Sequence, residues 1–243
     1  MRDWNGKRYW LVGASEGLGR ALAERLSRAG AELVLSARSG DRLEALAADL
    51  PGRAQAVPCD VTDGDSVAAA WERAGEVDGL IYLAGVYWPQ AATEWDPGQV
   101  VKMADVNFTG ACRVLGHVVP AFTARDRGHI VLTGSLSGFR GLPKSVGYAA
   151  SKAGVMVLAE GMHADLRGTG VKVQLVNPGF IRTRLTDKND FRMPQIMEPE
   201  AAAAEVFDHI SGDRFARHFP TALATALRGL NFLPDGLYYR IVG

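Results

Sequence analysis

The feature that most limits the fold of this chain is a regular alternation of short, mostly apolar runs with stretches of helical periodicity. The runs predicted to be strands are residues 9–12, 31–37, 54–57, 79–83, 129–133 and 171–176, with 215–220 as a candidate seventh. The stretches predicted to be helices are residues 17–29, 41–50, 65–74, 100–125, 147–166, 200–210 and 221–233. Because parallel strands are joined by helices that cover the sheet, this order predicts an α/β fold with helices on both faces of a parallel sheet. A barrel of eight strand–helix repeats is the alternative, but only six or seven strands are found.

The composition agrees with one domain of this kind. The chain has 243 residues, of which 47% are hydrophobic and 22% charged, as in globular proteins. No repeat or low-complexity linker divides it, so residues 1–243 are predicted to form a single domain. The 27 basic and 27 acidic residues give zero net charge, which argues against nucleic-acid binding.

Other classes of protein are excluded by what the sequence lacks. The first eight residues are too polar for a signal peptide, and no apolar run approaches the roughly 18 residues of a transmembrane segment. Cys59 and Cys112 lie far apart and suggest neither a disulfide framework nor a metal site, which is typical of a reducing, cytoplasmic setting. The five histidines lack the spacing of metal ligands, so no metal site is predicted.

A glycine-rich loop follows the first predicted strand and opens the first predicted helix. Its sequence, Gly13-Ala14-Ser15-Glu16-Gly17-Leu18-Gly19, has the pattern GxxxGxG. Such glycines allow a tight turn and let backbone N–H groups approach a pyrophosphate at the positive end of a helix. Many glycine loops are only turns, but the strand before this one and the helix after it favour a dinucleotide site.

The residues after the second predicted strand indicate which dinucleotide binds. An acidic residue there would bind the adenosine ribose and repel a 2′-phosphate, whereas arginine can bind that phosphate with two hydrogen bonds. The chain has Ser36-Ala37-Arg38, so Arg38 together with Ser15 favours NADP(H), with NAD(H) as the second choice. Arg38 as a solvated loop residue is the alternative. Glu16 also weakens the prediction, since a basic residue there would add affinity for phosphate.

Tyr148 and Lys152 form a candidate proton-transfer pair. They are four residues apart in a predicted helix, and therefore share one face of it. A free tyrosine has a pKa of about 10, and a neighbouring ammonium group would lower that pKa toward neutral pH. A lone Tyr-x-x-x-Lys pair is more often part of a solvated face. Here, however, Ser135 follows a predicted strand at the carboxyl end, where open α/β sheets bind ligands.

Together these motifs resemble those of the short-chain dehydrogenase/reductase family. The similarity runs from Lys7 to about Ser211 and covers the glycine loop, Asp60-Val61, Ala84-Gly85, Asn107, Ser135, Tyr148-x-x-x-Lys152 and the run Pro178-Gly179-Phe180-Ile181-Arg182-Thr183. The order and spacing of the whole set are far more specific than any one motif. The resemblance implies a single-domain, Rossmann-type, doubly wound parallel sheet and an oxidoreductase that interconverts a carbonyl and an alcohol.

The resemblance also implies roles for individual residues. Tyr148 would be the general acid/base, and Lys152 would hold the nicotinamide ribose and lower the Tyr148 pKa. Ser135 would hydrogen-bond the substrate oxygen, and Asn107 would position a water in a proton relay. The residues predicted to contact the cofactor are Gly13, Ser15, Glu16, Gly17, Leu18, Gly19, Arg38, Asp60, Val61, Ala84, Gly85, Tyr148, Lys152, Pro178, Gly179, Ile181 and Thr183.

Some positions depart from the family pattern. Val12 stands where a threonine is usual before the loop, and Tyr82-Leu83 replaces a usual pair of asparagines. We therefore expect side-chain hydrogen bonds that help hold the central sheet to be absent. None of the four catalytic positions is affected, so we expect activity to be retained.

The regions that would select the substrate match the family least. Residues 184–198 have the position of a mobile substrate lid, whose apolar residues, with Trp88, suggest a hydrophobic small-molecule substrate; ordinary helix packing is the alternative. Residues 213–243 are a divergent C-terminal extension. Its leucine stripe within 221–233 predicts packing on the core or on a partner copy, and weak peripheral membrane contact is a further alternative. The family resemblance implies a homodimer or homotetramer.

Two functions are compatible with these motifs. The first is the NADP(H)-dependent oxidoreductase. The second is a non-catalytic dinucleotide-binding redox sensor with the same fold. The complete set Asn107, Ser135, Tyr148 and Lys152 favours the enzyme, because a sensor does not need a proton relay.

Overall fold

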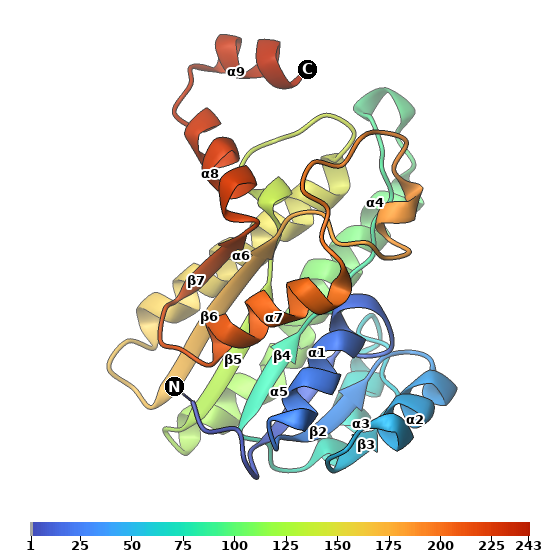
Figure 1. The fold of residues 1–243 in the computed structure, drawn as a ribbon, viewed down its shortest axis with the longest axis vertical. Coiled ribbons are helices and arrows are strands. Elements are labelled where there is room, and N and C mark those ends of the chain that lie inside the picture. The colour runs from blue at the N-terminus through green and yellow to red at the C-terminus, as the bar shows by residue number, and fades with distance from the viewer. Residues whose placement is uncertain (1) are drawn as a thin grey trace.

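Seven parallel strands form one sheet in the computed structural model, which describes residues 2–243 (Figure 1). The strands are β1 (Arg8–Val12), β2 (Glu32–Ser36), β3 (Ala54–Ala56), β4 (Gly79–Tyr82), β5 (Gly128–Thr133), β6 (Val171–Pro178) and β7 (Ala216–Phe219). Their order is β3-β2-β1-β4-β5-β6-β7, so the direction of winding reverses between β1 and β4. The predicted doubly wound parallel sheet is confirmed, including its seventh strand. Ligands of such sheets bind at the carboxyl ends of the strands near this reversal.

Helices cover both faces of the sheet. One layer contains α1 (Gly17–Arg28), α2 (Gly40–Asp49) and α7 (Pro199–Ile210), and the other contains α3 (Gly64–Ala74), α4 (Pro97–Ala104), α5 (Gly110–Ala124) and α6 (Val146–Asp165). Successive side chains of a strand point to opposite faces, so Leu11 packs with the first layer and Trp10 with the second. Both faces are buried, which explains why the strands read as continuous apolar runs.

The single long helix predicted over residues 100–125 is wrong in its start and its continuity. It begins at Pro97, where the Asp96 carboxylate accepts a hydrogen bond from the Gln99 N–H, and a π-turn at Asp105–Thr109 divides it into α4 and α5. The π-turn inserts one extra residue without ending the helix, so a continuous helical run in the sequence does not reveal it. The turn buries Asn107 completely, beneath the carboxyl end of the sheet.

The C-terminal residues form α8 (Thr221–Leu230) and α9 (Asp235–Val242) at the end of the sheet opposite the N-terminus (Figure 1). The helix predicted over 221–233 ends at Leu230 instead, and α9 was not predicted. Tyr238 of α9 is buried, and its hydroxyl donates to the Gly141 carbonyl over 2.8 Å. The Arg140 guanidinium lies 3.9 Å from the centre of the same ring. These contacts join α9 to the loop that precedes α6. None of the helices in residues 2–243 combines the length and apolar character needed to cross a membrane.

Candidate active site

The glycine loop is shaped by close backbone approaches that exclude side chains. Gly13 has φ +99°, and a Cβ atom there would lie 2.5 Å from the Ala84 nitrogen. A Cβ on Gly19 would lie 2.0 Å from the Gly13 oxygen, and one on Gly17 would lie 2.7 Å from Thr183 Cγ2. No side chain caps the first turn of α1. The loop therefore presents the free N–H groups of a helix start to the space between β1 and Thr183.

Two adjoining pockets lie at the carboxyl ends of the strands. Together they are lined by every residue that the sequence predicts to contact the cofactor, from the glycine loop through Asp60-Val61 and Ala84-Gly85 to Ile181 and Thr183. The first pocket contains Arg38, and the second contains Tyr148 and Lys152. An extended ligand with phosphates at the glycine loop could therefore place one end at Arg38 and the other at Tyr148.

Burial controls the protonation of Tyr148. It raises the pKa of the phenol to about 12, against an opposing hydrogen bond with Ser135, and the neighbouring Tyr87 raises it further. The two tyrosine rings meet edge to face with centres 4.9 Å apart. Lys152 Nζ lies 5.9 Å from the centre of the Tyr148 ring and donates to the Thr133 carbonyl over 2.9 Å. Lys152 is not among the groups that shift this pKa, so the pKa of Tyr148 is raised by burial and not lowered by Lys152 as expected.

Lys152 is itself affected by burial. Only 4% of its surface is exposed, and burial lowers the pKa of its ammonium group to about 8. The Thr133 carbonyl is its one hydrogen-bond partner among residues 2–243. An ammonium group has three protons, so two of them are left for a ligand hydroxyl in the pocket that Lys152 lines.

Asn107 and Ser135 lie near this pair. The Asn107 carboxamide accepts from the Val86 N–H over 2.8 Å and donates to the Val86 carbonyl and to Ser151 Oγ. Ser151 belongs to α6, between Tyr148 and Lys152, so Asn107 fixes that helix against the segment after β4. A water relay through Asn107 stays a prediction. Ser135 follows β5 and its Oγ lies 2.9 Å from Ser137 Oγ.

Two buried oxygen atoms near this pocket have no hydrogen-bond partner among residues 2–243. They are Thr133 Oγ1 and Asn177 Oδ1, at the ends of β5 and β6. Thr133 also lines the Tyr148 pocket. A buried hydroxyl left unpaired beside an open pocket fits a site that binds a polar ligand.

The first pocket is more basic than the sequence predicted. Arg42 and Arg184 line it in addition to Arg38, and both contact the Glu16 carboxylate. Burial opposes ionisation of Asp60, but hydrogen bonds from Thr62 and the charges of Lys102 and Arg38 hold its pKa below the usual value. Arg42 follows Arg38 by four residues and could have been noticed in the sequence, whereas Arg184 is brought there by the fold.

The segment of residues 184–198 lies against the residues that follow β4. The Tyr87 hydroxyl donates to Asn189 Oδ1 over 2.8 Å. Lys188 Nζ donates to the Tyr87 carbonyl over 2.7 Å and lies 4.2 Å from the centre of the Trp88 ring. Polar residues therefore make these contacts, while Phe191, expected in an apolar wall, is 43% exposed. Tyr87 was not among the predicted site residues, although it is next to Trp88 in the chain.

The side chain of Tyr82 corrects one expectation about the central sheet. Its hydroxyl donates to the Val106 carbonyl over 2.6 Å, within the π-turn, and Gly110 leaves room for it. A side-chain hydrogen bond from β4 is therefore present, although the usual asparagine is not. Among residues 2–243 no group of three or more His, Cys, Asp or Glu side chains is arranged to hold a metal ion.

Comparison with known proteins identifies relatives of this chain. The family model described as short chain dehydrogenase matches residues 7–193. An uncharacterised oxidoreductase of Myxococcus xanthus is 36% identical, with 98% of this chain and 97% of that protein covered. Another, from Staphylococcus haemolyticus, is 32% identical, with 84% and 90% covered.

Solved structures show the same arrangement. A short chain dehydrogenase/reductase from Burkholderia phymatum in complex with NAD has a TM-score of 0.85 at 25% identity, covering 94% of each chain. A short-chain dehydrogenase from Sphingobium yanoikuyae in complex with NADPH has a TM-score of 0.82 at 28% identity, covering 94% of this chain and 97% of that one.

Proposed function

The chain belongs to the short-chain dehydrogenase/reductase family of oxidoreductases, and on that premise we propose that it interconverts a carbonyl and an alcohol using NADP(H). One observation carries the proposal: two adjoining pockets connect the glycine loop to Tyr148 and Lys152. A dinucleotide fits this site on three grounds: the glycine cradle, the basic first pocket and the unpaired Thr133 hydroxyl. When bound, NADP(H) supplies or accepts the hydride.

The chain's own part in the reaction is to hold the substrate oxygen and move one proton. With a pKa of about 12, Tyr148 is protonated at neutral pH and can donate to a carbonyl oxygen that gains charge. Ser135 would share that oxygen and stabilise its charge. Lys152 would bind the ribose hydroxyls. Its positive charge would then lie beside the phenolate left after proton transfer.

The preference for NADP(H) rests on the charge of the first pocket. Arg38 follows β2 and has no ion pair within 4 Å among residues 2–243, so its guanidinium is available to a phosphate. The NADPH-bound relative and the NAD-bound relative have similar folds, so the pocket residues and not the fold must make this choice.

Residues 184–198 would act as a lid over the substrate. They reach Tyr87 and Trp88, whose rings lie close to Tyr148 and to Lys188 respectively. These aromatic rings favour a hydrophobic small-molecule substrate. We further propose that the protein is cytoplasmic and forms a homo-oligomer. Residues 213–243 are a C-terminal extension of the single domain.

A panel of carbonyl compounds and alcohols tests the proposed function. Oxidation of NADPH or NADH, or reduction of NADP⁺ or NAD⁺, would be followed at the absorbance of the reduced nicotinamide. We expect turnover of apolar carbonyl compounds with NADPH. Arg38→Ala should weaken NADPH binding and leave NADH binding nearly unchanged, with Arg182→Ala, outside both pockets, as the matched control. Tight NADPH binding without turnover of any compound would favour a dinucleotide sensor instead.

A further inference from the structure

Glu16 of the glycine loop is held by two arginines from distant parts of the chain. Its Oε2 atom accepts from Arg42 Nη1 over 3.2 Å and forms an ion pair with Arg184 Nη2. Arg42 belongs to α2, and Arg184 is the first residue of the segment 184–198. All three line the first pocket together with Arg38. One carboxylate therefore holds two guanidinium groups at the edge of the pocket proposed for the 2′-phosphate.

The backbone before and after Arg184 is held by hydrogen bonds, while its side chain is largely exposed. The Thr183 N–H donates to Thr186 Oγ1 over 3.0 Å, and the Thr186 hydroxyl donates to the Ile181 carbonyl over 2.8 Å. Thr183 in turn packs beside Gly17. The Arg184 side chain is 65% exposed. With the backbone held and the guanidinium exposed, Arg184 can exchange its partner by a change of side-chain rotamer alone.

A phosphate monoester is a stronger partner for these arginines than Glu16 is. It carries about −1.5 to −2 charges at neutral pH, against a single charge on a carboxylate. It also accepts hydrogen bonds on three oxygens, so it can serve several guanidinium groups at once. A phosphate entering this pocket would therefore compete with Glu16 for both arginines.

We propose that Arg184 is a third arginine for the 2′-phosphate of NADP(H), held in place by Glu16 until the phosphate binds. This inference rests on the proposed use of NADP(H). Glu16 then has two effects: it keeps Arg42 and Arg184 at the pocket, and its charge opposes the phosphate. Because Arg184 begins the proposed lid, the 2′-phosphate also holds the start of the lid, and NAD(H) does not.

Dissociation constants for NADP⁺ and NAD⁺ test this inference, since the two ligands differ only in the 2′-phosphate. They would be measured by titration calorimetry, with no turnover involved. The proteins are the wild type, Glu16→Gln, Arg184→Gln and the double variant. Arg182→Gln is the matched control: it is an exposed arginine in the same loop that pairs with Glu198 and lines neither pocket. Thermal unfolding would confirm that each variant is folded.

The inference predicts changes in the preference for NADP⁺ over NAD⁺. Glu16→Gln should increase it by about 3- to 10-fold, because a competing carboxylate is lost. Adding Arg184→Gln to that variant should reduce the preference for NADP⁺ again by about 3- to 10-fold. With the Glu16 carboxylate already removed, this loss can only come from a contact between Arg184 and the phosphate. Arg182→Gln should change neither constant.

The double variant decides whether Arg184 binds phosphate or only neutralises Glu16. If it binds NADP⁺ as tightly as Glu16→Gln alone while the wild type prefers NADP⁺, Arg184 does not bind the phosphate and this inference alone is overturned. A wild type without preference for NADP⁺ would overturn both the inference and the cofactor part of the proposed function.

Proteolysis tests the effect on the lid. A lysine-specific protease would cut after the exposed Lys188, four residues beyond Arg184. In the wild type, saturating NADP⁺ should slow this cut more than saturating NAD⁺ does. In Arg184→Gln, the two ligands should slow the cut equally. Equal protection by the two ligands in the wild type would contradict the link to the lid.

Discussion

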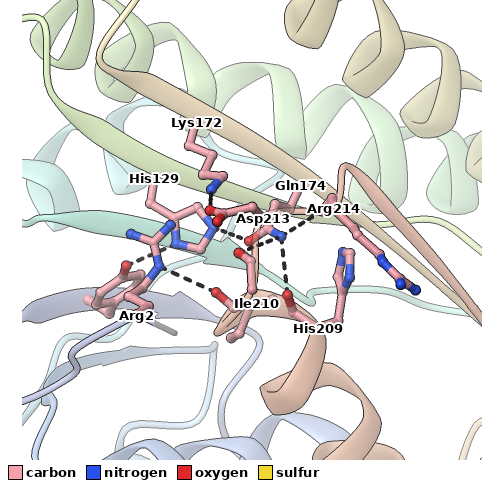
Figure 2. Close-up of polar contacts among 10 residues, drawn as sticks. Arg2, His129, Lys172, Gln174, His209, Ile210, Asp213 and Arg214 are labelled. Carbon is pink, nitrogen blue, oxygen red and sulfur yellow. Dashed lines mark hydrogen bonds and ion pairs between the residues drawn. The ribbon is translucent and has the colours of Figure 1, made fainter.

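Strands β5 and β6 bury polar side chains toward both ends of the sheet, and the two ends differ in how those groups are paired. Nearer the amino ends, His129 Nδ1 lies 2.9 Å from the Tyr9 hydroxyl. The other ring nitrogen, Nε2, lies 2.7 Å from Gln174 Oε1 (Figure 2). The Gln174 amide donates to the carbonyls of Arg214 and His209. Since that amide nitrogen is used as a donor, Gln174 Oε1 accepts from His129 Nε2–H, and His129 Nδ1 accepts from Tyr9.

This network holds its histidine neutral. Burial lowers the pKa of His129 well below its usual value, and the nearby charges of Arg2 and Lys172 lower it further. The Arg2 side chain also donates to the Ile210 carbonyl, which ties the N-terminal residues to the end of α7 (Figure 2). Apart from His209 Nε2, the buried polar atoms of these side chains have protein partners.

At the carboxyl ends the pairing is incomplete. Asn177 Nδ2 lies 3.0 Å from His218 Nδ1, but Asn177 Oδ1 and Thr133 Oγ1 have no partner among residues 2–243. Lys152 lies here too, with its charge disfavoured by burial. Unpaired buried groups cost stability, and the carboxyl ends, where they gather, are the place at which we propose that the cofactor binds. We call the carboxyl ends the open end, and the amino ends, where all of these polar atoms but His209 Nε2 are paired, the closed end.

The largest expected effect is at the open end. Tyr148→Phe removes the proton donor and keeps the ring, so it should lower kcat by about 10²- to 10⁴-fold with little change in the free energy of unfolding. Steady-state kinetics and urea unfolding measure the two quantities. Tyr239→Phe, which removes an exposed phenol from α9, is the control. A Tyr148→Phe variant with normal turnover would show that another group supplies the proton.

At the closed end the expected effect is on stability. Gln174→Leu leaves His129 Nε2–H and several carbonyls without partners, and should lower the free energy of unfolding by about 2 to 3 kcal/mol. Cofactor affinity of the folded protein should not change, because Gln174 lies outside both pockets. Urea unfolding and cofactor titration test the two statements. Loss of affinity with unchanged stability would reverse the roles of the two ends.

Acid should weaken the closed end. The folded protein keeps His129 neutral, whereas the unfolded chain takes up a proton near pH 6.5, so the unfolded state binds more protons below that pH. Stability is therefore complete above pH 6.5 and falls toward lower pH, by about 1.4 kcal/mol per pH unit for this group.

His218, whose pKa burial lowers to about 4, acts in the same direction. Urea unfolding from pH 8 to 5 measures the slope, and His129→Gln should reduce it by about one proton. Equal slopes in the two proteins would show that His129 is already charged in the folded state.

The smallest expected effect comes from Thr133→Val. The hydroxyl has no partner, so replacing it with a methyl group of similar size should change the free energy of unfolding by less than about 0.5 kcal/mol. The same variant should bind the cofactor more weakly, because Thr133 lines the Tyr148 pocket. Calorimetry and unfolding measure both. A loss of stability equal to that of Gln174→Leu would remove the difference between the two ends.

Local pattern was sufficient to predict most of the fold and the proposed cofactor site. The order of strands and helices follows from periodicity, and the glycine loop and Tyr148-x-x-x-Lys152 are short motifs whose geometry depends on adjacent residues. The π-turn at Asp105–Thr109 was missed because it inserts one residue without ending the helical run. Helix α9 was missed because its anchor, the contact of Tyr238 with Arg140, joins residues far apart in the chain.

The sequence by itself determined the parallel α/β sheet, the position of the glycine loop and the spacing of Tyr148 and Lys152. These depend on interactions between near neighbours, which a sequence records directly. Only the tertiary structure decided that Arg184 reaches Glu16, that Tyr87 lies against Tyr148, and that burial raises the Tyr148 pKa. Those features depend on which distant segments meet and on how much water they exclude, and both are set when the chain folds.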